Sequence, residues 1–434
     1  MAEQPSFREA LRYWFRLGWI SFGGPTGQIA IMHKDLVERK KWIPEDHFLQ
    51  ALNFCMLLPG PEAQQLATYI GWLLHGTRGG IVAGVLFVLP AVFILWGLSW
   101  LYAAFGTIPA ISALFYGLKP AVAAVVAEAV IRIGRKSLKN AALVCLAVAA
   151  FIGIFFLHVP FPAIVFASGA VGYLGGRFFP ARFAAVGQSP STPAEVYVIT
   201  DEMTSRRSSA GWGHVLKVVA ICLPLWFAPV AALGLWRGWD DIFVQIGLLF
   251  SKAAVVTFGG AYAVLAYVGQ QAVQHRGWLE PEQMMDGLGL AETTPGPLIM
   301  VTQFVGYLAS YLHAGGLAPA LAGAIGGLLT TWVTFVPCFM WIFAFAPFIE
   351  RVRKNARLGA ALSAVTAAVV GVVLNLFVVF TRHMLFPEVG PHFDWFALAA
   401  AATAFIGMQR WKWGMIPVII GSALAGGAWK WFVG

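Results

Sequence analysis

The chain contains an internal duplication, and this feature constrains its fold more than any other. Three elements recur at a single offset of 236 residues: Ser21-Phe22-Gly23-Gly24 as Thr257-Phe258-Gly259-Gly260, Trp42 as Trp278, and Pro59-Gly60-Pro61 as Pro295-Gly296-Pro297. Further along, Pro90 is matched by Pro337. Several matches in register over such a distance indicate two homologous halves.

The composition places both halves in a lipid bilayer. Of the 434 residues, 59% are hydrophobic and 11% are charged, whereas a soluble domain carries about 25% charged residues. Arginines at 8, 12 and 16 extend too far into the first apolar run for a cleavable signal. Because a span needs about 20 apolar residues, we expect an all-α polytopic membrane protein with about thirteen spans: 9–31, 48–74, 80–103, 108–131, 140–157, 161–176, 214–236, 243–268, 284–311, 317–347, 358–381, 394–409 and 414–432.

These spans divide the chain into four parts. We expect an N-terminal transporter repeat over 1–176, a cytoplasmic linker over 177–213, an extra connecting span over 214–236, and a C-terminal transporter repeat over 237–434. The linker is the one long polar stretch, and its Ser189-Pro190-Ser191-Thr192-Pro193 segment is typical of an exposed loop.

Equivalent loops of the two halves differ in charge. The loop at 105–107 is uncharged while its counterpart at 351–357 carries four cations, and the next pair reverses this, with four cations at 132–139. Short basic loops stay in the cytoplasm, so we predict inverted-topology repeats with a cytoplasmic N-terminus and a periplasmic C-terminus. The net charge of +9 then reflects cytoplasmic loops rather than nucleic-acid binding. One basic segment, 34–41, disagrees; it either lies flat on a surface or follows a re-entrant span.

Inverted repeats with broken helices are the architecture of secondary transporters, which bind substrate near the midplane. Proline ends one helix and fits the first turn of the next, so half-helices are predicted to begin near Pro61 and Pro297. Their unpaired N–H groups and positive dipole ends favour an anion. We therefore predict an oxyanion site from Pro59, Gly60, Pro61 and Gly296, with nearby polar side chains from Gln64, Gln65, Thr293, Thr294 and Gln303.

The Phe-Gly-Gly elements are predicted to join this site. Consecutive glycines let the backbone approach a ligand closely, and Thr26, Gln28 and Tyr262 lie near them as polar groups. Alternatively, these glycines only allow tight helix packing. The residues that we assign to the site here are Ser21, Gly23, Gly24, Thr257, Gly259 and Gly260.

Ionisable residues inside apolar spans point to function. Lys119, Lys252 and Glu292 are therefore assigned to the anion site, since a cation midway through a bilayer suits a divalent anion. The alternative is a buried ion pair, such as Lys119 with Glu292. Glu128 is expected to pair with Arg132, one helical turn on.

Enzymatic signatures are absent from the sequence. No phosphate-binding loop, paired-histidine metal motif or nucleophile elbow occurs, and the four cysteines are scattered singly. We expect no cofactor, no metal and no ATP. The membrane potential is worth about 2.3 kcal/mol per charge per 100 mV, so a divalent anion leaving a negative interior gains roughly 5 kcal/mol. An enzyme acting on lipid or quinone is the least favoured alternative, and the oligomeric state, a homo-oligomer included, stays open.

At these motifs the sequence resembles the chromate ion transporter family in its long, two-domain bacterial form. The resemblance covers almost the whole chain and is strongest at 20–25, 58–66, 87–90, 117–120, 257–262 and 289–297. It implies efflux of chromate across the inner membrane, resistance to chromate, and sulfate as a structural mimic. A transporter or channel for sulfate or another inorganic anion is the alternative.

Overall fold

The computed structural model describes residues 4–178, 197–199, 211–258, 261–349, 356–387 and 393–433. Within these ranges the regular elements are all helices. The first half contains α1 (Phe7–Ile20), α2 (Gly24–His33), η1 (Lys34–Arg39), α3 (Glu45–Leu57), α4 (Glu62–Phe105), α5 (Pro109–Ser137), α6 (Ala141–Phe155) and α7 (Phe161–Phe178). The predicted linker over 177–213 lies largely outside the described residues.

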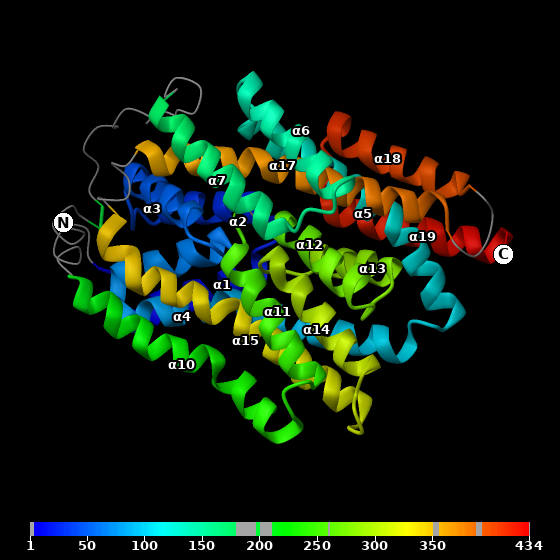
Figure 1. Cartoon of the computed structure of the whole chain (residues 1–434), viewed down its shortest axis with the longest axis horizontal. Helices are drawn as coiled ribbons and strands as arrows, with labels where there is room; N and C mark the ends of the chain where they lie inside the picture. The colour runs from blue at the N-terminus through cyan, green and yellow to red at the C-terminus, as the bar shows by residue number, and fades with distance from the viewer. Residues whose placement is uncertain are drawn as a thin grey trace.

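The second half repeats this order after α10 (Trp212–Arg237), which packs beside α15 along the lower edge of Figure 1. Its elements are α11 (Ile242–Val256), α12 (Ala261–Gly269), η2 (Gln270–His275), α13 (Pro281–Thr293), η3 (Leu298–Met300), α14 (Val301–Leu312), α15 (Pro319–Phe345), η4 (Ala346–Phe348), α17 (Ala356–Leu385), α18 (Trp395–Trp411) and α19 (Met415–Val433). Even the irregular π-helical turns η1 and η2 recur in place, as expected for a duplication.

α4 is a helical hairpin. Its backbone leaves helical geometry at His75 (φ −129°, ψ 24°) and Gly76 (φ 65°, ψ −158°), a conformation that Gly76 adopts without steric cost. Gly71 and Gly79 face each other across the two arms, and neither has room for a Cβ beside the other's backbone oxygen. The arms are residues 62–74 and 77–105, and α14 and α15 are their counterparts.

α1 and α2 also form a hairpin, which returns to the side where it began. Lys40 Nζ, just after η1, donates a hydrogen bond at 3.3 Å to Glu9 Oε1 in the first turn of α1. The second half repeats this contact at the same offset, where Arg276 Nη1 donates to Gln245 Oε1 at 2.9 Å. The start of each hairpin is thereby tied to its end.

α3 and the first arm of α4 form a second hairpin of the same kind. Gln4 Nε2, ahead of α1, donates to the backbone oxygen of Leu74 at the end of that arm. In the second half, Arg237 Nη2, ahead of α11, donates at 2.6 Å to the oxygen of Gly315 just after α14. Each half therefore holds two hairpins that begin and end on one side of the molecule.

The predicted segments 9–31, 48–74, 243–268 and 284–311 are thus re-entrant hairpins rather than complete spans. Hydropathy misses this because two apolar half-helices joined by an uncharged turn resemble one span. In the described chain, six helices are individually long and apolar enough to cross a membrane. The segments that run from one face towards the other are the second arm of α4, α5, α6, α7, α10, α15, α17, α18 and α19.

The hairpins account for the cations at 34–41. This segment lies beside the start of α1, and the backbone oxygen of Lys41 accepts a hydrogen bond at 3.2 Å from the N–H of Val198 in the linker. The second arm of α4 runs from this side to the turn at 106–108. α5 then runs back to the first side, where Arg135 and Lys136 lie in its last turn. We call this side the basic face, and the side of the turn at 106–108 the opposite face.

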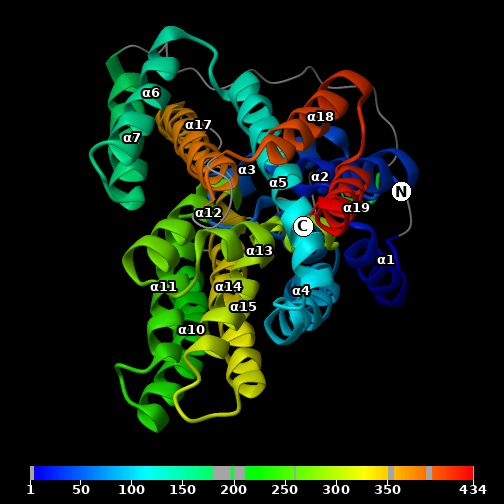
Figure 2. The ribbon, with the colours of Figure 1, turned by 90° about the vertical axis from the view of Figure 1, so that its right-hand side faces the viewer.

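The last helices of each half pack against the other half. α6 and α7 contact α17, while α18 and α19 contact α5, an exchange visible in Figure 2. Small residues permit the close approach: Gly371 of α17 lies against the backbone of Ala147 in α6, and Gly117 of α5 against Gly426 of α19. The exchange interlocks the two halves.

We expect cysteines introduced at Lys34 and Lys136 to react with an impermeant thiol reagent from the same side of the membrane, and a cysteine at Thr107 from the other. All three side chains are exposed, and the α1–α2 hairpin returns to the side of Lys136. Labelling of right-side-out and inverted vesicles measures this. Labelling of residue 34 from the Thr107 side would show that 9–31 is a complete span.

Candidate substrate-binding site

The hairpin tips of the two halves meet inside the molecule. The N–H of Gly60 donates to the oxygen of Thr257 at 2.9 Å, and the N–H of Gly296 donates to the oxygen of Ser21 at 2.8 Å. Each Pro-Gly-Pro turn thus binds the end of the helix before the Phe-Gly-Gly element of the other half. We call these four residues with their flanking turns the central junction.

Local sequence explains the shape of the two turns. Leu58 and Thr294, each followed by proline, are extended, with ψ of 146° and 149°, because proline disfavours helical geometry in the residue before it. Gly60 (φ 125°) and Gly296 (φ 106°) then adopt a positive-φ conformation, which glycine reaches without strain because it has no Cβ. This conformation turns each glycine N–H towards the other half.

Several helices begin at the central junction. α2 starts at Gly24, α4 at Glu62 and η3 at Leu298, and none of these three N-termini has a side-chain cap among the described residues. The first N–H groups of a helix have no partner within it, and the dipole there is positive. Such groups inside a bilayer need a hydrogen-bonding partner, and an anion is the partner that the dipole favours.

Two buried glutamines hold the junction, while a third, Gln64, donates to Thr68 Oγ1 within α4 at 3.2 Å. Gln28 Nε2 donates to the oxygens of Gly296 at 2.5 Å and Ser21 at 3.3 Å, and Gln65 Nε2 donates to Pro59 O at 2.8 Å. The Oε1 atoms of Gln28, Gln64 and Gln65 are buried without a partner in the described chain. Gln28, a polar residue near the first Phe-Gly-Gly element, therefore crosses between halves, which sequence spacing alone does not reveal.

The hydroxyl groups predicted as anion donors are used within their own helices. Ser21 Oγ donates to Leu17 O and Thr257 Oγ1 to Ala253 O, both at 2.6 Å. Thr293 and Thr294 likewise donate to carbonyls three residues earlier. In this conformation these hydroxyls end helices at the junction, and their protons are not available to an anion.

Two carboxylates on α13 are bound by tyrosines. Tyr262 Oη donates at 2.6 Å to Glu292 Oε1, and Tyr102 Oη donates at 3.0 Å to Asp286 Oδ2. Lys119 interacts electrostatically with Asp286; the alternative pairing of Lys119 with Glu292 is not formed.

The cation near Glu292 is Arg132, which forms the expected ion pair with Glu128 at 3.2 Å. Asp286 and Tyr102 are not among the site residues predicted from the sequence.

Some predicted site residues lie elsewhere. The side chain of Lys252 is exposed on the outer surface of α11. Gln303 Nε2 donates to Val92 O at 2.8 Å, and its Oε1 accepts from Thr331 at 2.8 Å, so it ties α14 to α4 and α15. Gly259 and Gly260 lie outside the described residues, while Gly23 (φ 87°) and Gly24 (φ 65°) form the equivalent turn in the first half.

Comparisons with known proteins agree with the duplicated architecture. A family model described as chromate transporter matches residues 8–173 and 244–427. The chain is 31% identical over 432 residues to a chromate transport protein of Pseudomonas aeruginosa, covering 97% of this chain and 92% of that protein.

Two further relatives carry similar descriptions. A chromate transport protein of Cupriavidus metallidurans is 28% identical over 385 residues, covering 88% of this chain and 84% of that protein. A probable chromate transport protein of Synechococcus elongatus is 27% identical, covering 88% and 86%. No solved structure matches the chain. The chain belongs to the chromate transporter family.

Proposed function

We propose that this protein is a secondary transporter that exports chromate and binds the anion at the central junction. The observation that carries the proposal is the reciprocal contact of Gly60 with Thr257 and of Gly296 with Ser21. It brings together hairpins that enter from opposite faces, and the uncapped N-termini of α2, α4 and η3 lie next to these contacts. The names of the relatives supply chromate as the substrate.

The hairpins suggest how access alternates. The first-half hairpins end on the basic face and the second-half hairpins on the opposite face, so movement of one pair opens the junction to one side. In this structure the junction is closed: a Cβ at Gly60 would lie 2.8 Å from Cys338 Sγ, and one at Gly296 would lie 2.7 Å from Ala91 Cβ. Binding a dianion there requires the tips to separate.

Loop charge supports the orientation and the driving force. A cytoplasmic basic face follows from the positive-inside rule, with the N-terminus and linker inside, the C-terminus periplasmic, and the protein in the bacterial inner membrane. The membrane potential then favours export of a divalent anion by roughly 5 kcal/mol per 100 mV. Export of this kind lowers internal chromate and confers resistance without ATP.

Transport of sulfate or another inorganic anion is the second candidate. Backbone N–H groups recognise negative oxygen atoms, and sulfate has the shape and charge of chromate. The backbone N–H groups at Glu62 and Leu298 therefore do not distinguish chromate from sulfate by shape.

We expect purified protein in liposomes to move chromate when a potential is imposed, and sulfate to compete. Chromate flux against time, with protein-free liposomes as control, measures this. Sulfate flux without chromate flux would show that sulfate, and not chromate, is the substrate. Absence of both fluxes would show that the protein is not a transporter of these oxyanions.

A further inference from the structure

Two cavities of the molecule occupy equivalent places in the two halves. One, of about 320 Å³, lies between α5 and α18 and reaches Lys412; the other, of about 420 Å³, lies between α17 and α6 and reaches His158. α17 is the counterpart of α5, and α18 of α6. We call the first the basic-face cavity and the second the opposite-face cavity.

Backbone geometry confirms that the two cavities correspond. His158 and Lys412 follow equivalent helices and share a left-handed conformation, with φ of 51° and 57°. The N–H of the residue after each donates to the backbone oxygen of a glycine six positions earlier. Val159 donates to Gly153 O at 2.9 Å, and Trp413 donates to Gly407 O at 3.2 Å. The inverted repeat therefore places one cavity towards each face.

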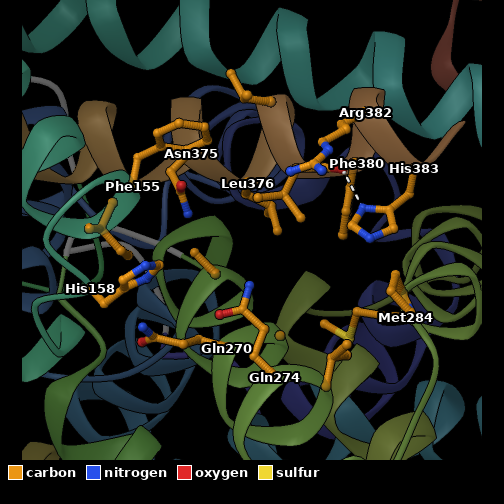
Figure 3. Close-up of a pocket in the computed structure, with 17 residues that line it drawn as sticks. Phe155, His158, Gln270, Gln274, Met284, Asn375, Leu376, Phe380, Arg382 and His383 are labelled. Atoms are coloured by element: carbon orange, nitrogen blue, oxygen red, sulfur yellow. Dashed lines mark hydrogen bonds between the residues drawn. The ribbon is translucent and has the colours of Figure 1, made fainter. Parts of the chain in front are cut away.

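The opposite-face cavity gathers polar and cationic side chains from three elements. Figure 3 shows His158 after α6, Gln270 and Gln274 on η2, and Asn375, Arg382 and His383 on α17 around one space. His383 Nδ1 lies 2.8 Å from Val379 O, which leaves Nε2 for a ligand. No carboxylate is among the described residues that line this cavity.

Gln270 lies at the buried side of this cavity. Its side chain is 7% exposed, and its Oε1 atom is buried without a hydrogen-bond partner in the described chain. This oxygen is an acceptor, so a deprotonated oxyanion, which only accepts hydrogen bonds, does not satisfy it. The case for an anion rests on Arg382 and the two histidines around a space with no carboxylate among its described lining residues.

The basic-face cavity has a much stronger positive charge. Arg132, Arg135, Lys136 and Lys412 line it with a single carboxylate, Glu128. Arg132 also acts electrostatically on Glu292, next to the central junction. On the other side, α13 begins at Pro281 in the opposite-face cavity and ends at Thr293 beside the same junction. One helix therefore runs from the opposite-face cavity to the junction, and Arg132 acts from the basic-face cavity on a carboxylate near the junction.

We propose that the opposite-face cavity is a second oxyanion-binding site, the release vestibule of the transporter, and that the basic-face cavity is its capture vestibule. The proposal rests on the proposed function. Four cations attract a dianion on one face, and a single arginine with neutral amides and histidines holds it more weakly on the other. A dianion is therefore captured more readily on the basic face and released more readily on the opposite face.

A thiol-protection experiment tests the release vestibule without measuring transport. Gln274 lines the cavity and is exposed, so Gln274→Cys is accessible to an impermeant thiol reagent. The probe is sulfate, because chromate oxidises thiols, with chloride at equal ionic strength as the control. Mass spectrometry of the peptide that contains residue 274 follows the labelling rate.

We expect sulfate, but not chloride, to slow labelling several-fold. Protection should persist in a Gly60→Ala background, since the vestibule does not include the junction. Arg382→Gln should abolish protection, whereas Lys430→Gln, which removes an exposed cation on α19 outside the cavity, should not.

Equal labelling in sulfate and chloride, or protection that survives Arg382→Gln, would overturn the vestibule. These outcomes are separate from the proposed function. Protection without chromate flux in liposomes keeps the vestibule and rejects chromate transport. Flux without protection keeps transport and rejects the vestibule.

Discussion

Gly60→Ala and Gly296→Ala should each reduce chromate flux in liposomes to the protein-free background. Both glycines have φ values that side chains rarely adopt, 125° and 106°, and such strain costs of order 1–3 kcal/mol. The added Cβ would also approach Cys338 Sγ to 2.8 Å in the first variant and Ala91 Cβ to 2.7 Å in the second. Relief of either steric clash would displace the glycine N–H that donates the hydrogen bond between the two halves.

Two other glycines provide matched controls. Gly97 in α4 and Gly421 in α19 are helical, and nothing lies within 4 Å of a Cβ added to either. Alanine favours a helix over glycine by about 1 kcal/mol, so both variants should insert and transport as the unaltered protein does. Normal chromate flux in well-inserted Gly60→Ala would remove the junction from the transport pathway.

The helix breaks could be predicted because their causes are local. Proline and glycine determine the backbone at Pro59-Gly60-Pro61 whatever surrounds them, and the duplication gives the same turn at 295–297. The contact of Gly60 with Thr257 could not be predicted, because it depends on hairpins from opposite faces reaching the same depth. The bond from Gln28 to Gly296 follows from that contact and was equally hidden.

Side-chain direction explains why two residues, Lys252 and Asp286, lie elsewhere than the sequence predicts. Lys252 is exposed although its neighbours Ser251 and Ala253 are buried. In a segment that is apolar all round, hydropathy does not show which side faces the protein. Asp286 was overlooked because it lies near the predicted start of a span, where a carboxylate is common; packing against Tyr102 makes it a buried group.

Lys119→Ala should lower chromate flux by at least about tenfold while leaving membrane insertion intact. Loss of about 1.4 kcal/mol of charge interaction lowers an affinity tenfold, and a partly buried cation beside a dianion supplies at least that much. The matched control is Lys252→Ala, which removes a lysine from another apolar helix whose side chain is exposed. Flux per unit of inserted protein should be unchanged in that control.

The double variant Lys119→Ala/Asp286→Asn separates two roles for the lysine. If Lys119 only neutralises Asp286, removing both charges should restore chromate flux, because the amide oxygen introduced at position 286 can still accept the hydrogen bond from Tyr102. If Lys119 attracts the transported dianion, the double variant should insert normally but show the same loss of flux as Lys119→Ala. We expect the second result, since Asp286 already has a tyrosine donor at 3.0 Å and a dianion crossing the same region has no other lysine on α5 between Pro109 and Arg132.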